Sequence, residues 1–255
     1  MGQPPRSRGA SAPAVTLETY ALLVRAIPYG ESDLVAQFFT SAVGRVSAMV
    51  RGGRKSRKRA GGAFEPFHTV SVRLEDRGRE LCTLKEAEIV VVRTRLVGHL
   101  GAMDGAGRVL RWVRSLCPPR VPEPEVWHTV STLLDALEDA CLRNDPQLDG
   151  EVSSLVAWAG LRLLAGAGFG LELEACVVCG KACPEGRPVL VDVARGGVVC
   201  RACGGGELLL DGKTREAAVK VMQASEPLVD LGESVKGLEK LVTRALELHE
   251  VERGR

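Results

Sequence analysis

Residues 17–51 read LETYALLVRAIPYGESDLVAQFFTSAVGRVSAMVR, and they contain three apolar segments separated by turn residues. The segments cover residues 17–27, 34–39 and 45–51 and are rich in Val, Leu, Ile, Ala and Phe. Pro28-Tyr29-Gly30 breaks the first segment from the second, and Gly44 breaks the second from the third. Short apolar runs bounded by such residues are typical of β-strands, so this stretch predicts three consecutive strands.

Two more segments of the same kind follow, over residues 69–75 and 81–92. Asp76-Arg77-Gly78 lies between them and predicts a hairpin turn. Five short strands within about 75 residues fit a small Greek-key barrel of the OB type. Barrels of this kind commonly bind single-stranded nucleic acid.

After residue 92 the apolar residues recur at helical spacing. We expect helices between residues 96 and 116 and over about 125–142, 151–167, 214–231 and 234–251. The 151–167 segment is apolar on most sides, which predicts a central position in a helical bundle. The fold class we predict is α+β: an N-terminal OB-fold β-barrel, then an α-helical domain with an inserted four-cysteine zinc module. We expect a disordered tail at 1–15, the barrel at 16–92, the helical domain at 93–255 and the module at 171–206.

The zinc module is predicted from two Cys-x-x-Cys pairs, Cys176/Cys179 and Cys200/Cys203, separated by twenty residues. Each pair would lie on a tight turn, which Gly180 and Gly204 permit. Four thiolates and no open position suit one structural, tetrahedral zinc ion. Two short strands, over 188–193 and 197–199, would complete a zinc ribbon.

The alternative for these pairs is a redox dithiol, but the βαβ surroundings of a thioredoxin-like site are absent from the sequence. Cys183 is close enough to replace Cys179 as a ligand, although the regular spacing favours a free thiol there. Cys82, Cys117 and Cys141 fall on strand or helix faces, and we interpret them as core residues.

A basic loop joins the third and fourth predicted strands. It carries six cations within nine residues: Arg51, Arg54, Lys55, Arg57, Lys58 and Arg59. Like charges this dense repel one another unless an anion is present, and phosphates are the natural counter-ion. Nothing in the loop reads base edges, so we expect nucleic-acid binding that is independent of sequence and sensitive to salt; the alternative is simply a solvated loop. Phe64 and Phe67 follow the loop and are candidates either for base stacking or for the core.

The charge distribution supports different partners for the two halves. Residues 1–92 carry 14 basic and 9 acidic side chains, whereas residues 93–255 carry 20 and 23. The first 15 residues lack the apolar block of a signal peptide, and no segment reaches the ~20 apolar residues of a membrane span. We therefore expect a cytoplasmic protein without a membrane partner.

Catalytic patterns are weak throughout the sequence. The segment 206–214, GELLLDGKT, resembles a phosphate-binding loop but has one residue too many between its glycines. We interpret Asp211 or Thr214 there as a helix cap. The four histidines are scattered, and no acid–base constellation can be assembled, so we do not expect an enzyme.

Several of these segments resemble the RecO family of bacterial recombination mediators. The residues that carry the resemblance are PYGESD at 28–33, Phe39-Thr40, GRV at 44–46, VRG at 50–52 and GAFEPF at 62–67, followed by LLAGAG at 163–168, CVVCG at 176–180 and GGVVCRAC at 196–203. They occur in the family's order and cover about residues 16–250. Some members of the family lack a complete set of cysteines, but this chain keeps all four.

The resemblance implies a mediator rather than an enzyme. Such proteins bind single- and double-stranded DNA, anneal complementary strands and displace single-strand-binding protein, whose acidic C-terminal tail docks on the helical domain. With RecR they load the recombinase RecA onto DNA, so RecA is an indirect partner, and such a protein is associated with the nucleoid when active. The alternative from a different class is an RNA-binding OB/zinc-ribbon protein, which a contact to the 2′-hydroxyl would distinguish.

Overall fold

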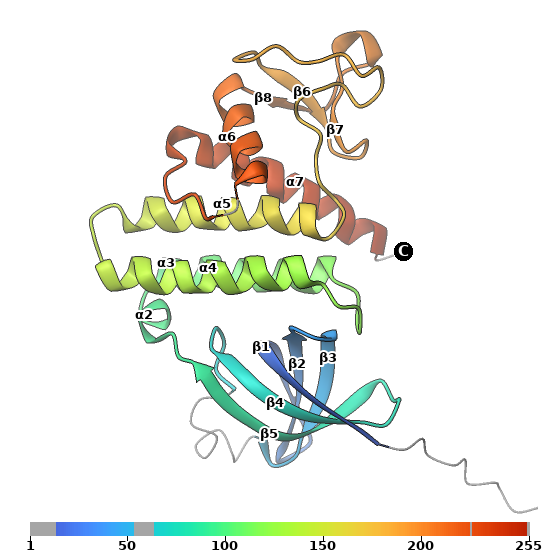
Figure 1. Cartoon of the computed structure of the whole chain (residues 1–255), viewed down its shortest axis with the longest axis vertical. Helices are drawn as coiled ribbons and strands as arrows, with labels where there is room; N and C mark the ends of the chain where they lie inside the picture. The colour runs from blue at the N-terminus through green and yellow to red at the C-terminus, as the bar shows by residue number, and fades with distance from the viewer. Residues whose placement is uncertain (1–13, 54–63, 225, 254–255) are drawn as a thin grey trace, which may run out of the picture. The chain divides into compact units, whose positions relative to one another are not determined.

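The computed structural model describes residues 14–53, 64–224 and 226–253 (Figure 1). Residues 1–13 of the predicted tail and the cations from Arg54 to Arg59 therefore lie outside the described residues, whereas Val15, which we assigned to the tail, already begins the first strand. The described part divides into two compact units, one within Met1–Phe38 and Val46–Val91 and the other within Phe39–Arg45 and Val92–Arg255. Among the described helices, none is long and apolar enough to cross a membrane.

The first five strands form a closed barrel, as predicted. They are β1 (Val15–Tyr29), β2 (Asp33–Thr40), β3 (Gly44–Val50), β4 (Thr69–Asp76) and β5 (Leu81–Val91), in the order β1-β2-β3-β5-β4. β1 and β5 each pair antiparallel with β4, and the parallel pairing of β3 with β5 closes the barrel. In β3 every second residue is buried and the others are partly exposed, as its sequence predicts. The β4–β5 pairing is less regular, with register shifts at Thr69/Val70 and Arg73/Leu74.

Apolar side chains from all five strands fill the barrel. Leu22, Phe38, Val72 and Leu74 are among its buried residues. Phe64 and Phe67 also belong to this core, with 4% and 5% of their surface exposed. The suggestion that these two rings stack on bases is therefore wrong, because a ring needs an open face for stacking.

The second unit is mainly helical. Its helices are α2 (Thr94–Val97), α3 (Leu100–Leu116), α4 (Pro124–Arg143), α5 (Leu148–Gly166), α6 (Gly212–Gln223) and α7 (Val235–Arg253). Helix α5 lies among the others, as predicted from its apolar composition: it packs against α3, α4, α6 and α7. Leu155, Trp158 and Leu163 of α5 are almost completely buried.

A small sheet lies between α5 and α6 in the sequence. It consists of β6 (Val189–Asp192), β7 (Gly197–Val198) and β8 (Leu208–Leu210), with β6 in the centre. We predicted β6 and β7 but missed β8. The expected helix 214–231 was too long, because α6 ends at Gln223 and Ala224 is already extended. Pro227 follows closely, and a proline disfavours continuation of a helix.

Candidate nucleic-acid interface and metal centre

The PYGESD segment forms the turn between β1 and β2 and also fixes the start of the basic loop. Asp33, the last residue of the segment, accepts a hydrogen bond from the backbone N–H of Gly52 at 2.8 Å. This bond and a second one from the Ser32 hydroxyl lower the pKa of the Asp33 carboxyl. The first end of the basic loop is therefore tied to the beginning of β2.

Two glycines shape the chain at this point. Gly52 has a φ of 66°, a left-handed conformation that glycine adopts without strain. A Cβ on Gly53 would lie 2.9 Å from Val50 Cγ1 and 3.0 Å from Leu34 Cδ1. The glycines of the VRGG sequence thus let the backbone leave β3 close against the core, between Arg51 and the next cation of the loop, Arg54.

Arg51, the one loop cation within the described residues, lines a groove of about 590 Å³ on the barrel. The other basic residues of the groove are Arg77 and Arg79, from the β4–β5 turn, and Lys85 of β5. In an OB fold, the loop between the last two strands is one of those that bind oligonucleotides. We refer to this surface, lined by Arg51, Arg77, Arg79 and Lys85 together with Glu75 and Glu86, as the barrel groove.

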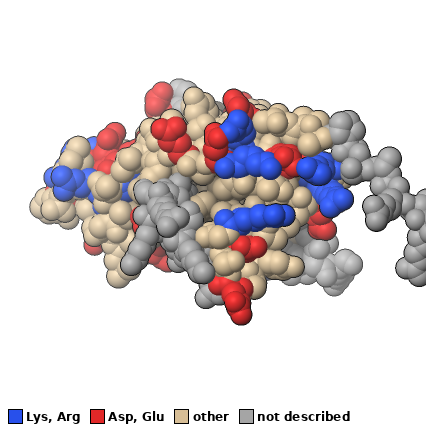
Figure 2. Space-filling view, turned by 90° about the horizontal axis from the view of Figure 1, so that it is seen from below, with Lys and Arg blue, Asp and Glu red and all other residues tan. Residues whose placement is uncertain are grey.

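Two of the groove's cations share one carboxylate. Glu75 Oε1 accepts from Arg77 Nε at 2.7 Å, and Glu75 Oε2 lies 2.8 Å from Lys85 Nζ. Lys85 and then Arg77 are the main causes that lower the pKa of Glu75. Lysine and arginine side chains likewise lie beside acidic ones on the described face in Figure 2. Among the residues that the structure describes, the groove lining is thus only moderately positive, with four cations and two carboxylates.

Sequence reasoning missed Arg77, Arg79 and Lys85 as candidate contacts. Arg51 and Arg79 are 28 positions apart in the chain. They line one groove because β3 and β5 pair in parallel, with Ser47 opposite Leu81 and Met49 opposite Thr83. The available signal was the Arg77-Gly-Arg79 hairpin at the position of an OB binding loop.

The second candidate site brings together all four predicted cysteine ligands. The sulfur atoms of Cys176, Cys179, Cys200 and Cys203 lie within 4.8 Å of one another, and those of Cys179 and Cys200 are 3.9 Å apart. Four sulfurs at about 2.3 Å from a tetrahedral zinc ion would be about 3.8 Å apart, whereas a disulfide would need about 2.05 Å. The cluster therefore has the dimensions of a metal site.

The backbone around the cysteines has the form of two tight turns. Cys176 and Gly180 are joined by a hydrogen bond from Gly180 N to Cys176 O of 2.8 Å, and Cys203 N donates to Cys200 O at 2.9 Å. Gly180 and Gly204 have φ angles of 71° and 107°. These are the positions at which the sequence predicted that glycine would be needed.

The charges of the cysteine cluster favour the binding of a cation. The amide N–H groups of Cys200, Cys179 and Val178 point at the Cys176 sulfur and lower its pKa to about 6. The neighbouring sulfurs of Cys200 and Cys179 raise the pKa of Cys203 to about 12. Four thiolates this close repel one another, so all four can be ionised together only around a metal ion.

Cys183 lies outside this cluster, as the regular spacing of the two cysteine pairs predicted. It is half-buried, and burial is the main cause that raises the pKa of its thiol. Cys82, Cys117 and Cys141 are buried, in agreement with their interpretation as core residues.

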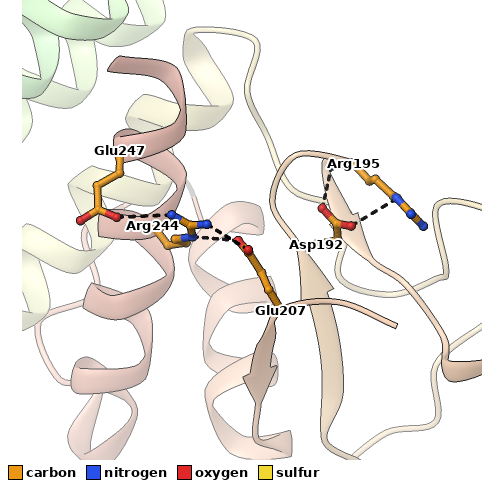
Figure 3. A network of polar contacts seen from close by, with 5 residues as sticks. All are labelled: Asp192, Arg195, Glu207, Arg244 and Glu247. Carbon is orange, nitrogen blue, oxygen red and sulfur yellow. Dashed lines mark hydrogen bonds and ion pairs between the residues drawn. The ribbon is translucent and has the colours of Figure 1, made fainter. Parts of the chain in front are cut away.

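One ion pair joins the last helix to the cysteine module, which in the structure extends through β8 and so covers residues 171–210. Arg244 of α7 donates to both carboxylate oxygens of Glu207, at 2.8 and 2.9 Å, and also contacts Glu247 (Figure 3). Arg195 pairs with Asp192 across the β6–β7 turn. Directly after β8, Asp211 caps α6 by accepting from Thr214 N at 2.9 Å, so of the two predicted caps Asp211 is the one used. The module is thus joined to α6 through the chain and to α7 through Arg244.

Comparison with known proteins agrees with this architecture. Residues 15–93 match the family model "Recombination protein O N terminal", and residues 105–249 match "Recombination protein O C terminal". The chain belongs to the RecO family of DNA repair proteins. It is 35% identical over 217 residues to DNA repair protein RecO of Anaeromyxobacter sp. strain K, covering 81% of this chain and 82% of that one. DNA repair protein RecO of Myxococcus xanthus is 33% identical over 184 residues, 72% of this chain and 71% of the relative.

Proposed function

We propose that this RecO family protein is a recombination mediator that binds single- and double-stranded DNA without sequence preference and anneals complementary strands. With RecR it would help to load RecA onto DNA coated with single-strand-binding protein, in the cytoplasm at the nucleoid. The observation that carries the proposal is the barrel groove, with four cations beside the start of the basic loop. Annealing requires two strands to be held together while their mutual repulsion is screened, and surface cations provide that screening.

The proposed contacts combine the groove with the loop. Arg51, Arg77, Arg79 and Lys85 would neutralise phosphates along the groove, and Arg54, Lys55, Arg57, Lys58 and Arg59 would extend the cationic surface. No aromatic ring is exposed among the groove's described lining residues, where Phe64 is buried. We therefore assign binding to phosphate contacts rather than to base stacking.

We also propose that the four cysteines hold one structural zinc ion. The spacing of the sulfurs and the soft thiolate donors fit zinc, and four protein ligands leave no position for a substrate. The ion would hold the two cysteine turns together and so stabilise the module that leads into α6. We assign no catalytic residue.

The test of DNA binding is salt-dependent affinity measured by fluorescence anisotropy with unrelated oligonucleotides. Replacing Arg77, Arg79 and Lys85 together by alanine should weaken binding to all sequences alike. The slope of log affinity against log salt should fall by about 2 on single strands, at about 0.7 per phosphate. The control replaces Lys213, Lys220 and Lys240, exposed lysines of the second unit, by alanine. An unchanged slope in the groove variant would refute the groove as a DNA surface.

A competition assay between RNA and DNA distinguishes the alternative function, RNA binding, from DNA binding. Unlabelled DNA and RNA of the same sequence should displace a labelled DNA strand equally well if only phosphates are read. A clear preference for RNA would indicate contact to the 2′-hydroxyl and favour the alternative.

A further inference from the structure

Arg215 is a buried cation for which the described residues offer no partner. It belongs to the first turn of α6 and keeps only 4% of its surface exposed. Its Nε and Nη1 atoms are shielded from solvent and make no hydrogen bond, and no carboxylate of the described residues forms an ion pair with it. Arg93, another buried arginine, is by contrast bound to Asp135 at 2.7 Å. A buried charge without a counter-ion is strongly unfavourable, so an anionic group is expected beside Arg215.

The first turn of α6 packs against the cysteine module. Gly186 lies so close to the start of the helix that a Cβ on Gly212 would be 2.2 Å from the Gly186 carbonyl oxygen. In the same loop, burial raises the pKa of the Cys183 thiol. The next strongest influence on that pKa is the Arg215 guanidinium, which lowers it, and two sulfurs of the cysteine cluster raise it. Arg215 and the cysteine cluster therefore both belong to the electrostatic surroundings of one thiol.

The carboxylates near Arg215 are bound to other groups. Three of them, next to it in α6 or beside Cys183, accept hydrogen bonds from backbone N–H groups: Glu172, Asp211 and Glu216. The cysteine cluster is the other source of negative charge here. Four thiolates around a divalent ion leave two negative charges uncompensated, and amide N–H groups that point at Cys176 supply only partial charges. A full positive charge close to the cluster is therefore favourable.

We propose that Arg215 is the counter-ion of the zinc-bound cysteine cluster and thereby increases the affinity of the cluster for the metal. Residues behind the ligands that stabilise their charge typically change metal affinity by about 10–100-fold. The burial of Arg215 without a carboxylate then has a physical reason, because its counter-charge is carried by thiolates that also bind the metal. The proposal rests on the zinc site of the proposed function and concerns a residue outside its four ligands.

The experiment measures the zinc affinity of the full, reduced chain by competition with a chromogenic chelator. Arg215→Met removes the charge but keeps much of the length of the side chain, and it should weaken zinc binding by about 10–100-fold. Arg215→Lys keeps the charge and should lose less affinity than Arg215→Met. The matched control is Lys213→Met, which removes an exposed cation of the same helix and should leave zinc affinity unchanged.

Thermal unfolding with zinc, and again after its removal by a chelator, separates the charge of Arg215 from its packing. With zinc, Arg215→Met should lower the melting temperature. Without zinc it should not, because it then removes a buried charge that has lost its counter-ion. Unchanged zinc affinity in Arg215→Met, an equal loss in Arg215→Lys or Lys213→Met, or an equal fall in melting temperature with and without zinc would overturn the proposal.

The zinc content of the wild-type chain is measured first, so that failure of the metal site is distinguished from failure of this proposal. A wild-type chain that binds no zinc would refute the metal site and the proposal with it. A wild-type chain that binds zinc as tightly as Arg215→Met does would refute the role of Arg215 alone.

Discussion

Glu75→Gln should make the protein bind single-stranded DNA more tightly, although it removes two ion pairs. Glu75 contacts Arg77 at 2.7 Å and Lys85 at 2.8 Å and so neutralises part of the barrel groove. Glutamine keeps the size of the side chain but not its charge. The charge of the described residues that line the groove would rise from +2 to +3, because of their two carboxylates only Glu86 would be left.

The expected size follows from counterion release. One additional phosphate contact adds about 0.7 to the salt slope on single strands. The ratio of variant to wild-type affinity should therefore be about fivefold larger at ~0.1 M salt than at ~1 M. The assay is fluorescence anisotropy of a labelled oligonucleotide over a salt series. Glu88→Gln is the matched control, because Glu88 is an exposed carboxylate of β5 outside the groove.

A stability measurement accompanies this assay. The pKa of Glu75 is lowered by its partners, so the loss of its charge is expected to reduce thermal stability even while DNA affinity rises. Unchanged or weaker DNA binding by a folded Glu75→Gln variant, with an unchanged salt slope, would refute the assignment of Arg77 and Lys85 to phosphates. The same increase in Glu88→Gln would show that net charge alone, and not the groove, sets the affinity.

Four further predictions concern the fold and the metal. Elemental analysis of freshly purified reduced protein should find one zinc per chain, and Cys200→Ser should remove it and lower the melting temperature. A wild-type protein that contains no zinc and is as stable as Cys200→Ser would contradict this. Gly197→Ala should destabilise the module by about 1–3 kcal/mol in urea unfolding, because a Cβ there would lie 2.2 Å from the Glu172 carbonyl oxygen. The control is Gly196→Ala, where no atom lies within 4 Å of the added Cβ. A loss of unfolding free energy no larger than in this control would contradict the clash. Asp33→Asn should reduce stability at neutral pH and make little difference in acid. The folded-state pKa of Asp33 lies below the unfolded value of 3.8, so its contribution to stability is present above that value and is lost as the pH falls through the folded pKa. An equal stability difference between variant and wild type at pH ~7 and pH ~2.5 would exclude this role. Leu155→Ala in α5 should cost about 2–5 kcal/mol of unfolding free energy, and a loss below about 1 kcal/mol would show that α5 is not central.

Local sequence signals predicted the strands of the barrel and most of the helices. The alternation of buried and exposed residues in β3, and the breaks at Gly30 and Gly44, are visible without a structure. The predicted helix extended past the end of α6 because the apolar spacing continues beyond Gln223, whereas Pro227 disfavours further helix. The strand β8 was missed because Leu208–Leu210 is a short segment that forms a strand only through its pairing with β6.

The residues of the two candidate sites could not be predicted equally well from the sequence. The four cysteines were identified directly, because ligand type and spacing are both local. The groove cations Arg77, Arg79 and Lys85 were not, since their proximity to Arg51 depends on the pairing of β3 with β5. The exposure of Leu209 between two buried leucines could not be predicted from sequence either, because it depends on the pairing of β8 with β6.

The most direct test of the mediator is the annealing of two complementary strands that have first been coated with single-strand-binding protein. The wild-type chain should accelerate duplex formation over the coated strands alone, and the Arg77/Arg79/Lys85 alanine variant should lose most of that acceleration. The Lys213/Lys220/Lys240 variant should anneal as the wild type does. Annealing no faster with the wild-type chain than without it, or equally fast with the groove variant, would contradict the account.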